Sequence, residues 1–425
     1  MLACGAVVVV IRTSTVQAAP IALGILQSTT GTMAISERPL VDAANMAVDE
    51  LNRAGGVLGR PVHAIIADGK SDPVVFASEA ERLIDQGVSA IVGCWTSASR
   101  KAVKPVVERR NHLLFYPLQY EGLEMSPNII YLGAAPNQQI IPAVKWAFGT
   151  LGHRMFLVGS DYVFPRAANA IIRDYMRAWH GQVLAEAYLP LGSRDVDGVV
   201  AEIKRLRPDV IVNTLNGDSN VAFFTKLRAA GITPSMMPTL SFSVAEEELR
   251  EMPAGLMTGD YTAWTYYQSV PIRSNEQFVK AFKQRYGDDR VTSDPIEAAY
   301  VAVKLWASAV ERAGTVDPRA VRAAVVDRSF RAPEGMIYVD GETQHTWKQI
   351  RIGRAGADGQ FTIVWASGEP IRPVPYPEQR TRAQWDAFEA SLFKRWGNQW
   401  VAPSQRASVF YSDPESTSRY ASAGR

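Results

Sequence analysis

Short apolar runs and stretches of helical periodicity alternate along the first part of the chain. The runs at residues 21–26, 62–67, 89–93 and 113–116 have the length of strands. The segments 36–52, 72–86 and 99–110 between them are predicted to be helices, and Asp72-Pro73 supplies a cap and a first-turn proline for the second of them. Strands that alternate with helices in this way predict a parallel sheet covered on both faces.

The same alternation returns in the second part of the chain. Strands are predicted at 154–159, 209–214 and 238–242, and helices at 166–180, 199–206, 220–230 and 245–252. A third set follows, with helices at 276–286, 295–313 and 318–327 and β-like stretches at 336–339, 347–352 and 361–365. Two doubly wound α/β units that exchange chain late in the sequence account for this order.

The C-terminal part has a different pattern. Residues 371–377 are rich in proline and predict an extended strap. Thr381 and Gln384 have the spacing of a capping box for a helix that carries Trp385, Phe388, Leu392 and Trp396 on one face. We expect strap and helix to pack on the body of the protein, the alternative being an exposed helix that binds a partner. Residues 403–425 are rich in serine and are expected to be disordered.

The composition of the chain narrows the range of functions that it can have. The chain has 425 residues, 47% of them hydrophobic, and its 45 Lys and Arg against 43 Asp and Glu give a net charge of +2. This balance argues against a nucleic-acid partner or a polybasic membrane contact, and no apolar run is long enough to predict a spanning helix. Five scattered His and two Cys predict neither a metal site nor a disulfide framework. No P-loop, G-x-S-x-G or HExxH motif occurs, so we expect no cofactor and no catalytic residues.

The first residues resemble a weak export signal. An apolar patch at 2–11 is followed by Val16-Gln17-Ala18, which fits cleavage after a small-x-small motif. No Lys or Arg precedes the patch, and Arg12 interrupts the approach to the cleavage site. We therefore expect residues 1–18 to be a degenerate or truncated signal and the protein to be periplasmic or on the cell-envelope exterior. A frayed cytoplasmic N-terminus or a wrongly chosen start codon is the alternative.

Aromatic and small polar residues gather where predicted strands end. Two such loops, 93–99 and 116–120, belong to the first unit, and two others, 159–165 and 214–220, belong to the second. Because open α/β sheets bind ligands at the carboxyl ends of their strands, these loops predict a binding cleft between the units. The candidate ligand-binding residues are Trp95, Thr96, Ser97, Tyr116, Gln119, Tyr120, Tyr162, Phe164, Asn216 and Asp218.

The same loops resemble those of the urea-binding proteins of ABC transporters. The resemblance runs from about residue 21 to residue 377 and includes the segments 93–103, 115–124, 133–139, 159–166 and 214–224. It implies a type I periplasmic-binding-protein fold, with two lobes joined by a hinge of three crossovers, and the permease subunits of an ABC transporter as partners. Lobe 1 is expected to comprise 19–140 and 271–341, and lobe 2 is expected to comprise 141–269 and 342–400 with the strap and helix.

Related family members are receptors for short-chain amides, including a cytoplasmic sensor that regulates amidase expression. The sensor's pattern has Tyr in place of Trp95 and of Phe164, and it lacks the loop 216–220. These differences favour urea, and an amide or urea sensor in the cytoplasm is the alternative. An amide-cleaving enzyme is a further alternative, which no nucleophile–base pair supports.

Urea is small, planar and neutral, with four N–H donors and one carbonyl acceptor. A specific site needs acceptors at both amino groups, a donor at the oxygen and flat walls. Asp218 is the expected acceptor, Ser97 and a first-turn N–H the expected donors, and Trp95 with the tyrosines and Phe164 the expected walls. The alternative for Asp218 is that it only caps the helix at 220–230.

Overall fold

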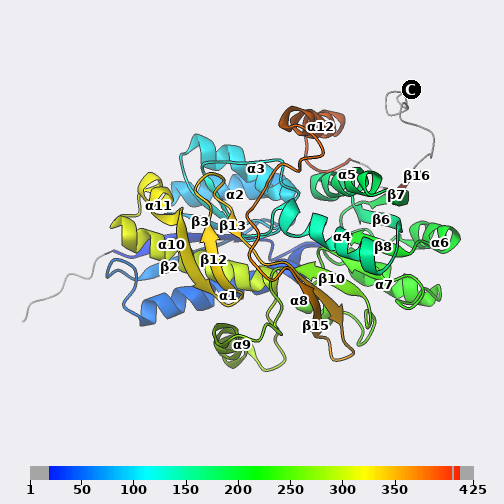
Figure 1. Cartoon of the computed structure of the whole chain (residues 1–425). Helices are drawn as coiled ribbons and strands as arrows, with labels where there is room; N and C mark the ends of the chain where they lie inside the picture. The colour runs from blue at the N-terminus through cyan, green and yellow to red at the C-terminus, as the bar shows by residue number, and fades with distance from the viewer. Residues whose placement is uncertain (1–18, 404–405, 412–425) are drawn as a thin grey trace, which may run out of the picture.

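The computed structural model describes residues 19–403 and 406–411, which form two large sheets, a small sheet and the helices that cover them (Figure 1). The first sheet is wholly parallel and has the order β2-β1-β3-β4-β5. Its strands are β1 (Ile21–Gln27), β2 (Val62–Asp68), β3 (Ile91–Gly93), β4 (Leu114–Tyr116) and β5 (Ile129–Tyr131). The helices around it are α1 (Ala34–Arg53), α2 (Pro73–Asp85), α3 (Ser97–Arg109), α9 (Arg273–Tyr286), α10 (Asp294–Ala313) and α11 (Pro318–Val325).

Local sequence explains how these elements form. The Asp72 side chain accepts a hydrogen bond from Val74 N, 2.8 Å away, so the predicted cap of α2 is confirmed. Gly93 ends β3 where a Cβ atom would lie 2.1 Å from Leu26 O of β1, so this close approach requires glycine. A buried cluster of apolar residues from β1, α1 and α10 then closes one face of the sheet, including Leu23, Ala44 and Trp306.

The second sheet is mixed, with the order β15-β14-β10-β9-β8-β6-β7-β16. Its middle strands β6 to β10 run parallel, whereas β14, β15 and β16 pair antiparallel. The strands are β6 (Arg154–Ser160), β7 (Gln182–Leu189), β8 (Val210–Thr214), β9 (Thr239–Ser241), β10 (Tyr261–Trp264), β14 (Arg351–Ala355), β15 (Phe361–Ala366) and β16 (Ser408–Tyr411). The accompanying helices are η1 (Pro136–Gln138), α4 (Ile140–Thr150), α5 (Val163–Ala178), α6 (Asp197–Leu206), α7 (Ser219–Ala229) and α8 (Glu246–Glu251). The α/β architecture with parallel-sheet lobes is confirmed.

A small antiparallel sheet lies where the chain passes between the large sheets for the last time. It consists of β11 (Arg328–Ala332), β12 (Gly335–Val339) and β13 (Thr346–Trp347). Its residues Ile337 and Val339 pack in the same buried cluster as the first sheet. The expected boundary at residues 341 and 342 falls between the paired strands β12 and β13. We therefore propose that the third crossing lies between Trp347 and Arg351, and the other lobe boundaries remain predictions.

The C-terminal helix α12 (Arg382–Arg395) packs on the body, as expected. Its capping box is confirmed, because Gln384 N donates to Thr381 Oγ1 and Thr381 N donates to Gln384 Oε1. Trp385, Leu392 and Trp396 share a buried cluster with residues of α3 and α5, among them Ala98 and Phe164. Figure 1 shows α12 in brown above the ends of α3 and α5. The helix therefore contacts elements that flank both large sheets.

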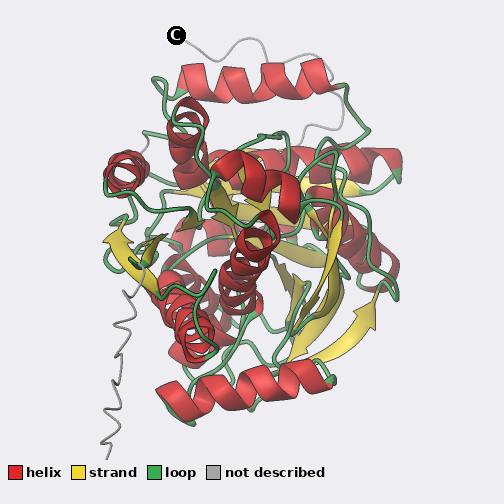
Figure 2. Cartoon of the chain, turned by 90° about the vertical axis from the view of Figure 1, so that its left-hand side faces the viewer, coloured by secondary structure: helices red, strands yellow, loops and turns green. Residues whose placement is uncertain are grey.

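The structure tests part of what was predicted for the two ends of the chain. Tail residues 408–411 were expected to be disordered, but they form β16, which pairs antiparallel with the edge strand β7. That part of the prediction is wrong, whereas residues 412–425 lie outside the described residues, as does the predicted export signal at 1–18. Strands β5, β7, β10 and β11 were not predicted from the sequence. Figure 2 shows the strands in yellow with helices in red packed around them. Within 19–403 and 406–411, no helix has the length and apolar character needed to span a membrane.

Candidate functional site

The strand ends of the two large sheets face each other, as the loop pattern predicted. Trp95, which follows β3, donates an indole N–H bond to Asn216 Oδ1 after β8, at 3.3 Å. Tyr116 at the end of β4 donates its hydroxyl hydrogen to Trp95 O at 2.7 Å. All three residues are buried. Trp95 and Asn216 are thus joined across the contact between the sheets, and Tyr116 bonds Trp95 from the side of the first sheet.

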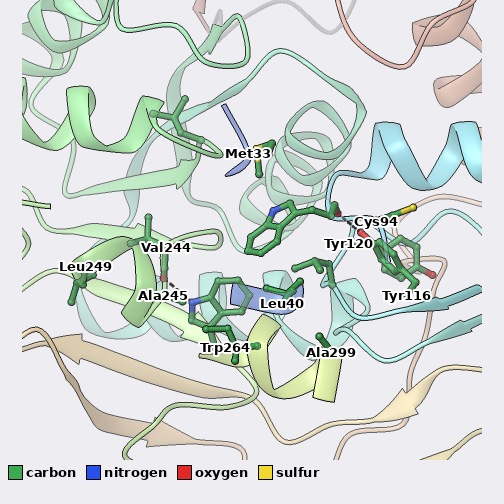
Figure 3. Close-up of a cluster of buried hydrophobic side chains, with 14 of the residues drawn as sticks. Met33, Leu40, Cys94, Tyr116, Tyr120, Val244, Ala245, Leu249, Trp264 and Ala299 are labelled. Carbon is green, nitrogen blue, oxygen red and sulfur yellow. Dashed lines mark hydrogen bonds between the residues drawn. The ribbon is translucent and has the colours of Figure 1, made fainter. Parts of the chain in front are cut away.

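Apolar side chains from both sheets surround this contact. Figure 3 shows Cys94 and Tyr116 on one side and Val244 and Trp264 on the other, all members of one buried cluster. The Trp264 indole donates to Val244 O at 2.7 Å, which holds the segment after β9 in place. A hydrogen bond that a ligand makes among such buried side chains is stronger than the same bond in water.

Tyr162 and Phe164 add aromatic surface from the second sheet. Their ring centroids are 6.3 Å apart, and both residues are buried. Burial raises the pKa of Tyr162, and the charges of Tyr116 and Glu121 act in the same direction, so this phenol lies close to the first sheet. The structure therefore brings Tyr162 to the residues around Tyr116, as expected for a wall of the site.

The roles predicted at the start of α3 differ from what the structure shows. Thr96 caps the helix by accepting a hydrogen bond from Ser99 N at 3.0 Å. The Ser97 hydroxyl donates to Glu121 Oε2 and accepts from Arg100 Nη1 at 3.0 Å. Its single hydrogen is thus already used, so the prediction that Ser97 is a free donor for the ligand oxygen is not met by this arrangement.

Arg100 packs against the ring of Tyr116, and two buried glutamates neutralise its charge. Its guanidinium contacts Glu121 Oε1 at 3.1 Å and Glu124 Oε1 at 3.0 Å, and all three side chains are buried. Burial opposes ionisation of Glu124, but Arg100 and the nearby lysines outweigh it and hold the pKa of that carboxyl below its usual value. The ring centroid of Tyr116 lies 5.0 Å from the guanidinium carbon. The positive charge of Arg100 is therefore compensated before any ligand arrives.

Tyr120 and Gln119 occupy different surroundings. The Tyr120 hydroxyl bonds His345 Nε2, and its ring stacks on Tyr131 at a centroid distance of 5.2 Å. Tyr120 thus packs inside the body of the protein and not in the wall predicted for it. Gln119 Nε2 donates to Phe242 O at 2.9 Å across the sheets, while its Oε1 is buried without a partner among the described residues. An unpaired buried acceptor is costly unless another molecule supplies a donor.

Asp218 lies at the rim of the contact, with 31% of its side chain exposed. It accepts a hydrogen bond from Thr32 Oγ1 of the loop after β1, and Arg194 Nη2 lies 3.5 Å from Oδ2. Although Asp218 stands at the N-terminus of α7, its side chain makes no capping bond to the described backbone. The structure therefore does not support the capping alternative, and it assigns Asp218 a link between the two sheets.

The loop after β1 and the start of α1 were missing from the predicted site. Ser36 Oγ donates to Glu248 Oε1 of α8 at 2.6 Å, and Glu37 beside it is 1% exposed. Burial raises the pKa of Glu37 to about 8. The polar run 27–32 follows a predicted strand in the same way as the four loops that were selected. Applying the strand-end argument to this first strand would have found these residues.

Comparison with known proteins places this geometry in a family. Residues 21–382 match the family described as Periplasmic binding protein domain. The Leu/Ile/Val-binding protein homolog 8 of Brucella abortus (strain 2308) is 24% identical over 407 residues, which cover 88% of this chain and 98% of that protein. A limonene hydroxylase of Geobacillus stearothermophilus is 34% identical over 117 residues, but the match spans 28% of this chain and 21% of that protein.

Solved structures share the fold. An ABC-transporter solute binding protein from Rhodopseudomonas palustris BisB5, in complex with 3,4-dihydroxybenzoic acid, has a TM-score of 0.73 at 19% identity and covers 83% of this chain and 99% of its own. A leucine binding protein from Thermotoga maritima MSB8 has a TM-score of 0.72 at 20% identity and covers 81% and 98%. Since the family match extends over most of the chain and the sheets have the expected arrangement, the chain belongs to the periplasmic binding protein family and has its type I fold.

Proposed function

We propose that this binding protein is an extracytoplasmic receptor that carries urea to the permease of an ABC transporter. The family consists of binding proteins, so its members act by holding a ligand. The ligand is the finer part of the proposal, and the observation that carries it is the buried, unpaired Gln119 Oε1 at the contact between the sheets. An acceptor in that position calls for a ligand with N–H donors.

Charge at the site favours a neutral ligand over an acid. The structural relatives include proteins solved with 3,4-dihydroxybenzoic acid and benzoate, which are acids. A carboxylate ligand needs an available cation, but Arg100 is already neutralised by Glu121 and Glu124. Asp218 adds a further acidic group at the rim of the contact. Urea, which is uncharged and rich in donors, suits this set of acceptors better than a benzoate does.

Size supports the same ligand. Trp95 already reaches Asn216, and Gln119 already reaches Phe242 O, so side chains of the two sheets touch directly. A ligand of few atoms fits such a contact with small adjustments, whereas an aromatic acid requires the sheets to move further apart. Flat aromatic walls from Tyr162 and Phe164 suit a planar molecule.

Calorimetric titration of the purified protein tests the proposal. Urea, acetamide, formamide, leucine and 4-hydroxybenzoate are titrated separately under identical conditions. Urea should bind most tightly, because acetamide replaces one amino group by a methyl and leaves an acceptor unpaired, at a cost of about 1–3 kcal/mol. Tight binding of leucine or 4-hydroxybenzoate without binding of urea would refute the ligand assignment.

A further inference from the structure

The segment that contains α12, residues 375–402, is anchored beside the second sheet on both sides of the helix. Before the helix, Arg380 Nε lies 2.6 Å from the carboxylate of Asp174 in α5. After the helix, Trp400 O accepts a hydrogen bond at 3.1 Å from the backbone N–H of Val163, the first residue of α5. We call residues 375–402 the C-terminal segment, and most of it follows the part of the chain that matches the family.

The C-terminal segment also contacts elements beside the first sheet. The Lys101 ammonium group of α3 lies 2.9 Å from the Glu389 carboxylate of α12, and both residues are buried. The same ammonium nitrogen lies 4.8 Å from the centroid of the Trp400 ring. At the start of the segment, Pro375 O accepts a hydrogen bond from Leu123 N at 2.9 Å. The C-terminal segment is thus attached to residues that flank both large sheets.

Helices α3 and α5, which this segment joins, both begin at the candidate site. Helix α3 begins shortly after Trp95, and α5 begins directly after Tyr162. Ala98 and Phe164, near the starts of the two helices, share one buried cluster. Figure 1 shows α12 above the ends of both helices. Because each helix is fixed to strand ends that face the other sheet, a separation of these strand ends also moves α3 away from α5.

Lys101 has a second acidic partner besides Glu389. Its ammonium nitrogen lies 3.3 Å from Glu124 Oε2, on the side of the first sheet. Burial lowers the pKa of Lys101, but Glu389 and Glu124 outweigh burial and raise this pKa to about 12, so Lys101 is charged. If α12 moved away from α3, Lys101 would keep Glu124 as a partner and water would reach Glu389. The contact between α3 and α12 can therefore break without leaving a buried charge unpaired.

We infer that the C-terminal segment is a conformational device that favours the closed arrangement of the two lobes, and that the contact between Lys101 and Glu389 breaks when the lobes separate to admit or release a ligand. The lobes are closed in the structure, since Trp95 bonds Asn216 across the sheets. The inference goes beyond the proposed function, because the contact does not depend on which ligand is bound. By stabilising the closed form, it raises the affinity for any ligand that this form holds.

Substitution Glu389→Met tests the inference, because methionine is similar in size and cannot form an ion pair with Lys101. Asp386→Met is the matched control, since Asp386 is an exposed carboxylate of the same helix and its partner Arg382 also belongs to α12. Measurements are made at about pH 8.5, so that the wild-type carboxylate is ionised, because burial raises the pKa of Glu389 to about 7.

Small-angle scattering of the ligand-free proteins measures how open the lobes are, calorimetry measures urea affinity, and a thermal melt checks that each variant is folded. Glu389→Met should shift the ligand-free protein toward a larger radius of gyration and weaken urea binding about tenfold, and a change in either measurement that the control does not show supports the inference. A folded variant that equals the wild type in both measurements, or a control that changes equally, would overturn it.

The proposed function and this inference fail separately. If the wild type binds no urea, the proposed function is wrong, and the scattering of the ligand-free proteins alone decides about the C-terminal segment. Should Glu389→Met melt far below the wild type, Glu389→Gln replaces it and the same measurements decide, because the amide removes the charge at nearly constant size.

Discussion

Removing the Trp385 side chain should show how firmly α12 is held to the body of the protein. The indole is fully buried, and its N–H donates to Pro377 O at 2.9 Å. Arg380 lies over the ring, 4.4 Å from its centroid, and Phe388 meets it edge-on at 6.0 Å. Trp385→Ala therefore removes apolar burial, a hydrogen bond and a cation–π contact in one step.

The expected loss follows from these contacts. Replacing a buried Trp by Ala costs about 3–5 kcal/mol through lost burial and the cavity that remains. The unpaired Pro377 carbonyl and the lost Arg380 contact add about 1 kcal/mol, unless water reaches the cavity. We expect the free energy of unfolding to fall by about 4–6 kcal/mol. Trp385→Phe keeps the ring burial and should lose about 1–2 kcal/mol.

Equilibrium unfolding in guanidinium chloride measures these losses, since urea is the proposed ligand and is unsuitable as a denaturant. Circular dichroism and tryptophan fluorescence should be followed together, and Ala387→Ser on the exposed face of α12 serves as a neutral control. A loss below about 1 kcal/mol for Trp385→Ala would refute the packing described here.

Three other expectations concern the site and the sheets. Asp218→Ala should weaken urea binding in calorimetry and leave the melting temperature nearly unchanged, because its side chain makes no capping bond; near-normal affinity with a lowered melting temperature would contradict this. Burial, aided by the charges of Asp294 and Glu248, raises the pKa of Glu246 to about 8. The unfolded chain releases this proton near pH 4.5 and the folded protein only near pH 8, so the stability that the proton contributes falls between these values. Relative to Glu246→Gln, the wild type should lose about 1 kcal/mol of stability per pH unit across that range, and parallel pH profiles would exclude it. Gly93→Ala should destabilise the protein strongly, since the new Cβ meets Leu26 O, whereas Gly149→Ala, with open space around it, should not; equal melting temperatures would disprove the clash.

Local signals predicted much of the fold. The Asp72 cap, the Thr381 and Gln384 box and the apolar stripe of α12 act through neighbouring residues, so the sequence alone reveals them. β7 was missed because its sequence, QVLAEAYL, is rich in alanine and contains a glutamate. It becomes a strand through pairing with β6 and β16, which are distant in sequence.

The sequence indicated where the candidate residues lie in the fold, but it did not indicate their hydrogen-bond partners. Strand-end loops indicated the edges at which the two sheets face each other, and Trp95, Tyr116 and Asn216 meet there. The partners of Ser97 and Tyr120 depend on Glu121 and His345, which reach them from other segments of the chain. Such long-range pairings leave no periodic trace in the sequence, so the sequence could not show that these hydroxyl groups are occupied.

Strand β16 ends the second sheet and replaces the long edge of β7 by a strand of only four residues. Its residues 408–411 cover the outer edge of β7, whose backbone N–H and C=O groups would otherwise be open to pairing with another chain. Arg166 lies over the rings of Tyr188 and Phe410 and so holds the two strands together from one face. A protein shortened to end before Ser408 exposes this edge while keeping the rest of the sheet. Such a shortened protein is therefore expected to aggregate more readily at high concentration, although residues 408–411 are not among the candidate ligand-binding residues.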